Sequence, residues 1–275
     1  MFTLNCKGRI LVLDKPVVMG IMNITPDSFY TASRVNDQKS FLQMAEKMIA
    51  DGASIIDIGG QSTRPGTTSI SVDEELSRVI PFVSDLNKYF PSLIISIDTF
   101  YSRVAQEALD SGASIVNDIS AGMIDKDMID TVGKSGAPYI CMHMKGTPEN
   151  MQHQAHYENI ILEILDYFIQ KINTCRLAGI KDIILDPGFG FAKTISHNFE
   201  LLRNLKMFEM LDRPVLAGLS RKSTVYKTLG ISTEEALNGT TVLNTLALAN
   251  GANILRVHDV KEAREAIELY LEYLG

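Results

Sequence analysis

Several short apolar segments of the chain end on a carboxylate, an amide or a cation. The clearest case is residues 183–191, Ile-Ile-Leu-Asp-Pro-Gly-Phe-Gly-Phe, where Pro187 and the glycines after it stop a buried strand just past Asp186. Large rings are unusual in a solvated loop, so Phe189 and Phe191 indicate that something flat covers this one. The segment predicts a carboxylate presented to a ligand at the carboxyl end of a strand. A turn with hydrophobic plugs is the alternative, and packing is the favoured role for Phe189.

The same layout recurs along the chain, with a polar residue at or just after the end of an apolar segment. Any one of these residues is as well explained by turn formation or helix capping, which Asp and Asn favour. Together they form a set of acids, amides and cations that parallel strands would bring to one edge. The set is Asn23, Asp57, Asp98, Asn117, His143, Asp186, Arg256 and His258.

The segments that position this set alternate between helix and strand. A helix repeatedly ends at Gly, usually Gly-Ala, and an apolar strand begins at once. Ser71 and Asp259, each with a Glu three residues later, predict helix starts, and Ser196 is predicted to cap the helix through Leu205. The predicted strands are residues 17–22, 55–57, 93–98, 115–117, 139–143, 183–186, 214–217 and 254–256.

Apolar strands that alternate with helices, each strand buried on both faces, predict an α/β fold of the (β/α)8 TIM barrel class. Residues 1–275 are expected to form a single domain, in which a short N-terminal β-hairpin within residues 1–16 caps one end of the barrel. An open doubly wound sheet normally carries Gly-x-Gly-x-x-Gly after its first strand, and Asn-Ile-Thr-Pro at residues 23–26 does not fit that pattern. The active site of a barrel lies at the carboxyl ends of its strands.

The loop after the second predicted strand supplies hydrogen-bond donors to this face. Residues 59–66 read Gly-Gly-Gln-Ser-Thr-Arg-Pro-Gly. Its glycines let the chain change direction, Thr63 and Arg64 offer donors, and Pro65 stiffens the tip.

The loop after the seventh predicted strand supplies cations. Residues 218–224, Gly-Leu-Ser-Arg-Lys-Ser-Thr, place Arg221 and Lys222 near a helix start, which suits an anion or a flat ring rich in acceptors. A basic solvated turn is the alternative. Arg256 and His258 lie at the last strand, where barrels often bind phosphate.

Composition limits the partners. The chain has 275 residues, of which 45% are hydrophobic and 21% charged, and its net charge of -7 is expected to repel nucleic acid and anionic membranes. Cys6, Cys141 and Cys175 lie far apart, which favours reduced thiols in a cytoplasmic protein over disulfides or zinc. No segment reads as a signal peptide or a membrane span.

In their order along the chain, these motifs resemble the signature of the dihydropteroate synthases, from about residue 17 to residue 275. The resemblance implies a pterin-binding barrel of folate biosynthesis, often homodimeric. Such an enzyme condenses 6-hydroxymethyl-7,8-dihydropterin diphosphate with 4-aminobenzoate and releases 7,8-dihydropteroate and diphosphate, with Mg²⁺ present. The motifs are Asn23 to Phe29, Ser62 to Gly66, Ser96 to Thr99, Asn117-Asp118, Met142 to Met144, Asp186 to Phe191, Ser220 to Ser223 and Val257 to Val260.

The resemblance also implies how the site is divided among its ligands. The residues implied for the pterin are Asp98, Asn117, Met142, Asp186, Gly218 and Lys222. Those implied for aminobenzoate are Phe29, Thr63, Arg64, Pro65, Phe191 and Ser223. Those implied for the diphosphate are Asn23, Thr63, Arg64, Arg256 and His258, with Asn23 as the protein ligand to Mg²⁺.

The mechanism implied by the resemblance is dissociative. Diphosphate leaves first, and the exocyclic methylene becomes a cation delocalised into the pterin. Carboxylates at Asp98 and Asp186 would stabilise charge that exists only near the transition state. The implied catalytic residues are Asp98, Asp186, Lys222 and Arg256.

Two departures from the family pattern leave alternatives open. Residues 30–34, Tyr-Thr-Ala-Ser-Arg, replace the usual Ser-Asp-Gly-Gly, and Gln61 stands where Glu is common. One alternative is a methyltetrahydrofolate-dependent methyltransferase of the same barrel class, although Ser-Thr-Arg-Pro-Gly and Ser-Arg-Lys-Ser are intact here. The others are a non-catalytic pterin-binding module and an aldolase in which Lys222 forms a Schiff base.

Overall fold

The computed structural model describes residues 1–24, 34–61 and 69–275, with residues 34–37 described by their backbone alone. Its parallel sheet has the order β8-β7-β6-β5-β4-β3-β10-β9. An isolated parallel bridge between Leu185 and Val215 joins β8 to the segment before β9 and completes the ring. The strands are β3 (Val17–Asn23), β4 (Ala53–Gly59), β5 (Ile94–Asp98), β6 (Ile115–Asp118), β7 (Tyr139–Met142), β8 (Ile183–Asp186), β9 (Leu216–Ala217) and β10 (Ile254–Val257).

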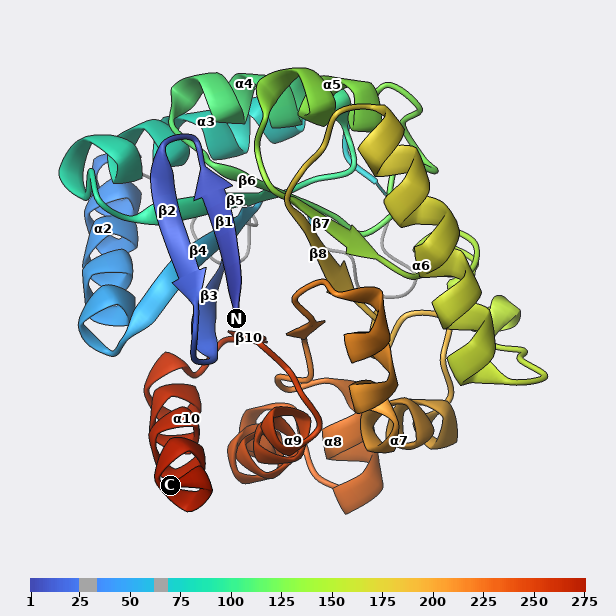
Figure 1. Cartoon of the computed structure of the whole chain (residues 1–275). Coiled ribbons are helices and arrows are strands. Elements are labelled where there is room, and N and C mark those ends of the chain that lie inside the picture. Colours follow the sequence, from blue (N-terminus) through green and yellow to red (C-terminus); the bar gives the residue numbers. More distant parts are fainter. Residues whose placement is uncertain (25–33, 62–68) are drawn as a thin grey trace.

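Helices lie outside this sheet and follow its strands in sequence, so the predicted TIM barrel is confirmed (Figure 1). Right-handed strand-helix-strand crossovers account for such an arrangement. None of the described helices is long and apolar enough to cross a membrane. The α-helices are α2 (Arg34–Ala50), α3 (Val72–Tyr89), α4 (Ser102–Ser111), α5 (Met128–Ser135), α6 (Ile160–Leu177), α7 (Ile195–Arg203), α8 (Ser223–Leu229), α9 (Leu237–Ala249) and α10 (Val260–Leu274), and the 3₁₀ helices are η1 (Met151–Gln154), η2 (Leu205–Leu211) and η3 (Glu234–Ala236).

One of the three predicted helix caps is present. The Ser71 hydroxyl accepts a hydrogen bond from the Glu74 amide at 3.2 Å and caps α3. Ser196 does not cap α7, because that helix begins earlier and Thr194 caps it in a reciprocal pair with His197. Asp259 precedes α10 but makes no capping bond, because its carboxylate pairs with Arg221 instead.

The N-terminal hairpin, β1 (Phe2–Cys6) and β2 (Arg9–Leu13), covers the end of the barrel opposite the carboxyl ends of the strands, as Figure 1 shows. Its alternating side chains Leu4, Cys6, Leu11 and Leu13 join the cluster that fills the barrel interior. Burial of each such leucine stabilises the fold by roughly 1.5–3 kcal/mol. Arg9 fastens the hairpin by donating to the carbonyls of Pro91 and Leu93, both at 2.9 Å.

Strand register decides which side chains meet at the open end of the barrel. Gly59, Asp98 and Asn117 lie side by side on β4, β5 and β6, and Met142 pairs with Asp186 across β7 and β8. All three cysteines are buried and unpaired. The polar groups predicted at strand ends are therefore neighbours in space, on elements whose other side chains pack the core.

Candidate active site

A charged network connects four strands, β4, β5, β6 and β10, at the carboxyl end of the barrel. Arg256, on β10, donates from Nε to Asp57 Oδ2 and from Nη2 to Asp98 Oδ2, both at 2.6 Å. Asn117, on β6, donates to the same Asp57 oxygen at 3.0 Å. Asp57, Asp98 and Asn117 are all buried, so the guanidinium is held between two carboxylates in a mostly dry setting. Sequence reasoning named Asp57 as a strand-end acid but assigned it no ligand.

Burial governs the protonation of this network. It raises the pKa of the Asp98 carboxyl to about 7, against the attraction of Arg256 and with the help of neighbouring Asp57. Burial also raises the pKa of Asp186, while Lys222 opposes the shift. For Arg256, burial acts to lower the pKa, but Asp57 and Asp98 more than offset it and raise the pKa, so the guanidinium stays charged.

The loop that begins at Asp186 has a geometry that only glycine allows. Asp186 Oδ1 accepts a hydrogen bond from the Gly188 amide at 2.7 Å, which closes a tight turn. Gly188 has a φ of +71°, and a Cβ there would lie 2.1 Å from the carbonyl oxygen of His143. Phe189 is fully buried in the main core, as predicted, and Phe191 is half-buried. Phe191 packs against a small apolar cluster that includes Met142 and Phe100.

Lys222 faces this loop from the N-terminal end of α8. Its amine donates to the Phe189 carbonyl at 2.5 Å and lies 4.8 Å from the centre of the Phe191 ring. Burial lowers the pKa of Lys222 to about 8, and Asp186 opposes that shift. Gly218 approaches the same amine, since a Cβ at that position would lie 3.5 Å from Nζ. Asp186, Gly218 and Lys222, all predicted to bind one ligand, are thus adjacent.

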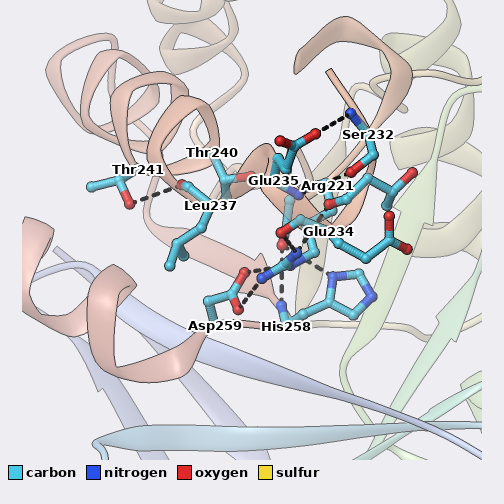
Figure 2. Close-up of polar contacts among 11 residues, drawn as sticks. Arg221, Ser232, Glu234, Glu235, Leu237, Thr240, Thr241, His258 and Asp259 are labelled. Atoms are coloured by element: carbon cyan, nitrogen blue, oxygen red, sulfur yellow. Dashed lines mark hydrogen bonds and ion pairs between the residues drawn. The ribbon is translucent and has the colours of Figure 1, made fainter. Parts of the chain in front are cut away.

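Arg221 does not share this orientation, although the sequence suggested two cations side by side. Its guanidinium makes a bidentate pair with Asp259, as Figure 2 shows, at 2.8 and 2.9 Å. Lys222 alone of these two cations therefore borders the predicted pterin pocket. The physical reason is that the Asp259 carboxylate and the carbonyls of Thr233 and Glu234 bind the guanidinium away from Lys222.

His258 follows β10 and is tied to the loop after β9. The Ser220 hydroxyl lies 3.0 Å from His258 Nδ1 and also accepts from the His258 amide at 3.2 Å. The pKa of His258 is lowered to about 4, mainly because the protein around the ring removes part of its solvation and secondly because Arg256 is positively charged. His258 is also exposed to solvent. It therefore presents a neutral imidazole at the surface, near Arg256, where the diphosphate is predicted to bind.

Asn23, at the end of β3, is the predicted magnesium ligand. Among the described residues its side-chain amide makes no hydrogen bond, and it lies beside Asp98, since both approach the position that a Cβ on Gly59 would occupy. An amide carbonyl is a hard oxygen ligand of the kind that Mg²⁺ accepts together with waters and phosphate oxygens. No group of three or more His, Cys, Asp or Glu in the described ranges forms a metal cage. The residues fit a Mg²⁺ ion that is held mainly by a phosphorylated substrate.

The predicted aminobenzoate side is described in part. Ser223 begins α8, one residue after Lys222, and is partly exposed, as is Phe191. Phe29, Thr63, Arg64 and Pro65 lie outside the described residues. Their predicted roles stay predictions.

Two buried ionisable groups near the site were not anticipated. Burial lowers the pKa of Lys193 to about 7, with Asp186 opposing, and its amine contacts the Phe191 carbonyl at 3.0 Å and His143 Nδ1 at 3.1 Å. The sequence placed His143 at the barrel mouth, but its ring is engaged by Lys193 and packs edge-on against Tyr167. Lys193 follows Phe191 by two positions, which was the only signal that could have found it.

The second unanticipated group is Glu75 on α3. It is fully buried and accepts a hydrogen bond at 3.0 Å from the side-chain amide of Gln61. Burial raises its pKa to about 8, and the nearby charge of Asp98 adds to the effect. Gln61 thus presents an amide, rather than a second carboxylate, to a buried acid.

Comparison with known proteins places this geometry in a family. The family described as "Pterin binding enzyme" matches residues 19–258. A protein of Escherichia coli K12 named dihydropteroate synthase is 42% identical over 265 residues, which cover 96% of this chain and 93% of that relative. The Haemophilus influenzae dihydropteroate synthase is 39% identical and covers 97% of both chains.

Solved structures of dihydropteroate synthases have the same fold as this chain. The Yersinia pestis dihydropteroate synthase in complex with a sulfonamide drug superposes with a TM-score of 0.93 at 39% identity, covering 99% of each chain. The Xanthomonas albilineans dihydropteroate synthase with 7,8-dihydropteroate gives a TM-score of 0.90 at 34% identity, covering 100% of this chain and 99% of the other. The chain therefore belongs to the dihydropteroate synthases, within the pterin-binding enzyme family.

Proposed function

We propose that this chain, acting as one pterin-binding domain, condenses 6-hydroxymethyl-7,8-dihydropterin diphosphate with 4-aminobenzoate to give 7,8-dihydropteroate and diphosphate. The observation that carries the proposal is the network at the barrel mouth. There Arg256 bridges Asp57 and Asp98 at 2.6 Å, with Asn117 bonded to the same Asp57 oxygen. Family membership supports the same activity.

The pterin is assigned to the buried half of the site. Its edge carries the N–H donors of an aminopyrimidinone, which the carboxylate of Asp186 and the amide of Asn117 suit as partners. The Lys222 ammonium, held 2.5 Å from the Phe189 carbonyl, supplies a donor for the ring's acceptor atoms. Met142 and Gly218 are buried beside these groups and give the flat ring apolar contact.

The diphosphate is assigned to the side of Arg256 and His258. Arg256 remains charged, and neutral His258 has a ring N–H to donate or a ring nitrogen to accept. Asn23 would hold Mg²⁺ through its side-chain oxygen, and that ion would supply neutralising charge to the diphosphate oxygens.

The reaction is proposed to be dissociative. The bond between the exocyclic methylene and oxygen breaks, diphosphate takes the electron pair, and the pterin methylene becomes a delocalised cation. The carboxylates of Asp98 and Asp186 stabilise that cation in a buried setting, where electrostatic preorganisation is most effective. The aniline nitrogen of aminobenzoate then forms the carbon–nitrogen bond and loses a proton. This nitrogen is already nucleophilic, so the site needs no strong base.

Aminobenzoate is assigned to the half of the site next to Phe191 and Ser223. Phe191 offers the face of a half-buried ring, and Ser223 offers a hydroxyl at the start of α8. Thr63, Arg64, Pro65 and Phe29 complete the proposed assignment, and Thr63 and Arg64 also serve the diphosphate. Exclusion of water by the surrounding loops would protect the cation from hydrolysis.

The proposed assembly is a cytoplasmic homodimer. Free, buried thiols at all three cysteines support a reducing compartment. Exposed apolar residues on α9 and α10, such as Leu246 and Leu269, support a self-association surface. Sedimentation equilibrium reports the mass, and fractionation with immunodetection reports the compartment.

The test is a direct assay of the purified chain with the pterin diphosphate, aminobenzoate and Mg²⁺. We expect equal amounts of dihydropteroate and diphosphate, and loss of turnover when EDTA replaces Mg²⁺. Asp186→Ala should abolish pterin binding in calorimetry while circular dichroism stays unchanged. A folded chain that binds the pterin but releases no diphosphate would show that it is a binding module instead.

A further inference from the structure

Arg221 has a strained backbone conformation, and its side chain forms hydrogen bonds only with other parts of the described protein. Its φ of +53° lies in the left-handed region that non-glycine residues rarely adopt. The guanidinium makes four hydrogen bonds (Figure 2). Two go to the Asp259 carboxylate at 2.8 and 2.9 Å, and two go to the carbonyls of Thr233 and Glu234 at 3.0 and 2.8 Å.

These bonds join segments that are distant in sequence. Asp259 follows β10, Thr233 and Glu234 belong to the η3 region, and the Arg221 amide donates to the Thr240 hydroxyl of α9 at 3.0 Å. Arg221 therefore connects the loop after β9 to the loop after β10 and to the helices between them. Bidentate arginine–carboxylate pairs fix orientation as well as distance.

Two of the residues next to the pair in sequence, Lys222 and His258, are those assigned above to the proposed substrates. Ser220 and Lys222 flank Arg221, and His258 precedes Asp259. Ser220 is bonded to His258, while the Lys222 amine reaches the Phe189 carbonyl. A change in how Arg221 holds Asp259 would shift Lys222 relative to His258, and with them the pterin position relative to the diphosphate position.

We propose that Arg221 and Asp259 are positioning residues that set the spacing between the pterin-binding Lys222 and the diphosphate-binding His258 without touching the substrate. The inference rests on the proposed function, because it assumes that the pterin diphosphate spans these two residues. The pair is about one-fifth exposed on each side, so solvent weakens it only partly.

The experiment compares the wild type with Arg221→Gln, Asp259→Asn, the double variant and Arg221→Lys in steady-state assays. Either single neutral variant should raise KM for the pterin diphosphate about tenfold and change kcat less than about twofold, as loss of one partner of a charge pair disturbs binding. The double variant should be no worse than Arg221→Gln alone, because Asp259→Asn breaks a contact that Arg221→Gln has already removed. Arg221→Lys keeps a charge without the planar fork and should give an intermediate KM.

The matched control is Arg103→Gln, which removes an exposed ion pair with Asp73 on the outside of the barrel. It should leave both constants at their wild-type values. Thermal unfolding is recorded for every variant, since partial unfolding lowers the apparent kcat but leaves KM unchanged.

The outcomes separate the two proposals. A wild type that makes no dihydropteroate overturns the proposed function and this inference with it. An active wild type whose variants keep a normal KM overturns the inference alone. The same holds if kcat falls only in proportion to the folded fraction, or if the effects of the two single variants multiply in the double variant.

Discussion

Arg256 lies between the carboxylates of Asp57 and Asp98, and this order of charges determines how each acid behaves. Asp57 is fully buried, and its Oδ1 has no hydrogen-bond partner among the described residues. An unpartnered buried oxygen costs stability unless the site uses it. At the residue scale, Asp57 therefore acts both as an anchor for Arg256 and as a negative charge that raises the pKa of Asp98.

Asp57→Asn should change the pH dependence of the reaction as well as its rate. Asp57 raises the pKa of Asp98, so its neutralisation should lower that pKa from about 7. If the ionised form of Asp98 is the active one, kcat/KM rises with pH through that pKa, and the variant's acid limb should lie at lower pH. We also expect kcat/KM at the optimum to fall about 10-fold to 100-fold, since one charge-assisted bond to Arg256 is weakened.

The measurement is kcat/KM against pH from about pH 5 to pH 9 for wild type and variant, where the profile reports the free enzyme. Asp73→Asn serves as the control, because that acid lies on the surface. An acid limb that stays in place would exclude the coupling between Asp57 and Asp98.

At the scale of elements, α3 holds the start of the loop that follows β4. Arg78 donates to the Gly60 carbonyl at 2.9 Å, and Glu75 accepts from Gln61. Gly60 also packs closely on this helix, because a Cβ there would lie 2.7 Å from Val79. Contacts with α3 therefore fix Gly60 and Gln61, the residues that immediately precede the Ser-Thr-Arg-Pro-Gly motif.

Glu75→Gln should alter how stability depends on pH. The folded chain raises the pKa of Glu75 from 4.5 to about 8, so in this interval the unfolded chain releases its proton first and stability is lost as pH rises. Glutamine has no proton to lose and keeps a hydrogen bond with Gln61. The stability of the variant relative to wild type should therefore increase between about pH 5 and pH 8, by at most about 1.4 kcal/mol per pH unit.

Urea unfolding at several pH values measures this difference. Glu74→Gln, one residue earlier on α3, is the matched control, since its side chain is about half exposed rather than buried. A constant difference between Glu75→Gln and wild type across this range would contradict a protonated Glu75.

At the scale of the whole molecule, the outer face of the last helices is unusually apolar. Leu246 of α9 is 44% exposed, and Leu269 and Tyr273 of α10 are 73% and 84% exposed. The two helices border a groove that Leu269 and Tyr273 line together with Thr245, Tyr270, Glu262 and Glu265. Exposed apolar side chains on neighbouring helices are typical of the interface of a two-fold dimer.

Leu246→Glu should therefore produce monomers. A carboxylate introduced into an apolar interface is buried without a partner, so the proposed dimerisation should weaken by at least about 100-fold. Sedimentation velocity over a range of concentrations measures the effect. Leu162→Glu, on α6, is the control, since Leu162 is also an exposed leucine at 56%. A wild type that sediments as a monomer, or dissociation in both variants alike, would reject this interface.

Sequence patterns predicted the barrel because its signals are local. Strands such as residues 183–186 are short apolar runs bounded by Gly or Pro, and their order requires only the right-handed crossover rule. Asp186, Asn117 and Lys222 likewise lie at the strand and helix ends where the sequence placed them. Alternation in the hairpin was visible for the same reason.

The features that the sequence did not predict depend on contacts between residues that lie far apart along the chain. Asp259 looked like a helix cap, but an arginine 38 positions earlier recruits its carboxylate. Ser196 and Thr194 are equally good caps by type, and the start of α7 decides between them. Burial of Lys193 and Glu75 runs against composition rules, since charged residues are rarely inside unless partnered. Each of these cases needed the tertiary structure.

The pairing of β3 with β10 bears on how the chain is synthesised. Ile254 lies opposite Val17, and Val17 donates to the carbonyl of Asn253 at 3.0 Å, so the early strand needs a partner made more than two hundred residues later. During translation the β10 side of β3 remains an unpaired edge, and such edges are prone to pair with other chains. Nascent chains that stop before residue 254 cannot close the ring. Closure of the barrel must therefore wait until β10 has left the exit tunnel.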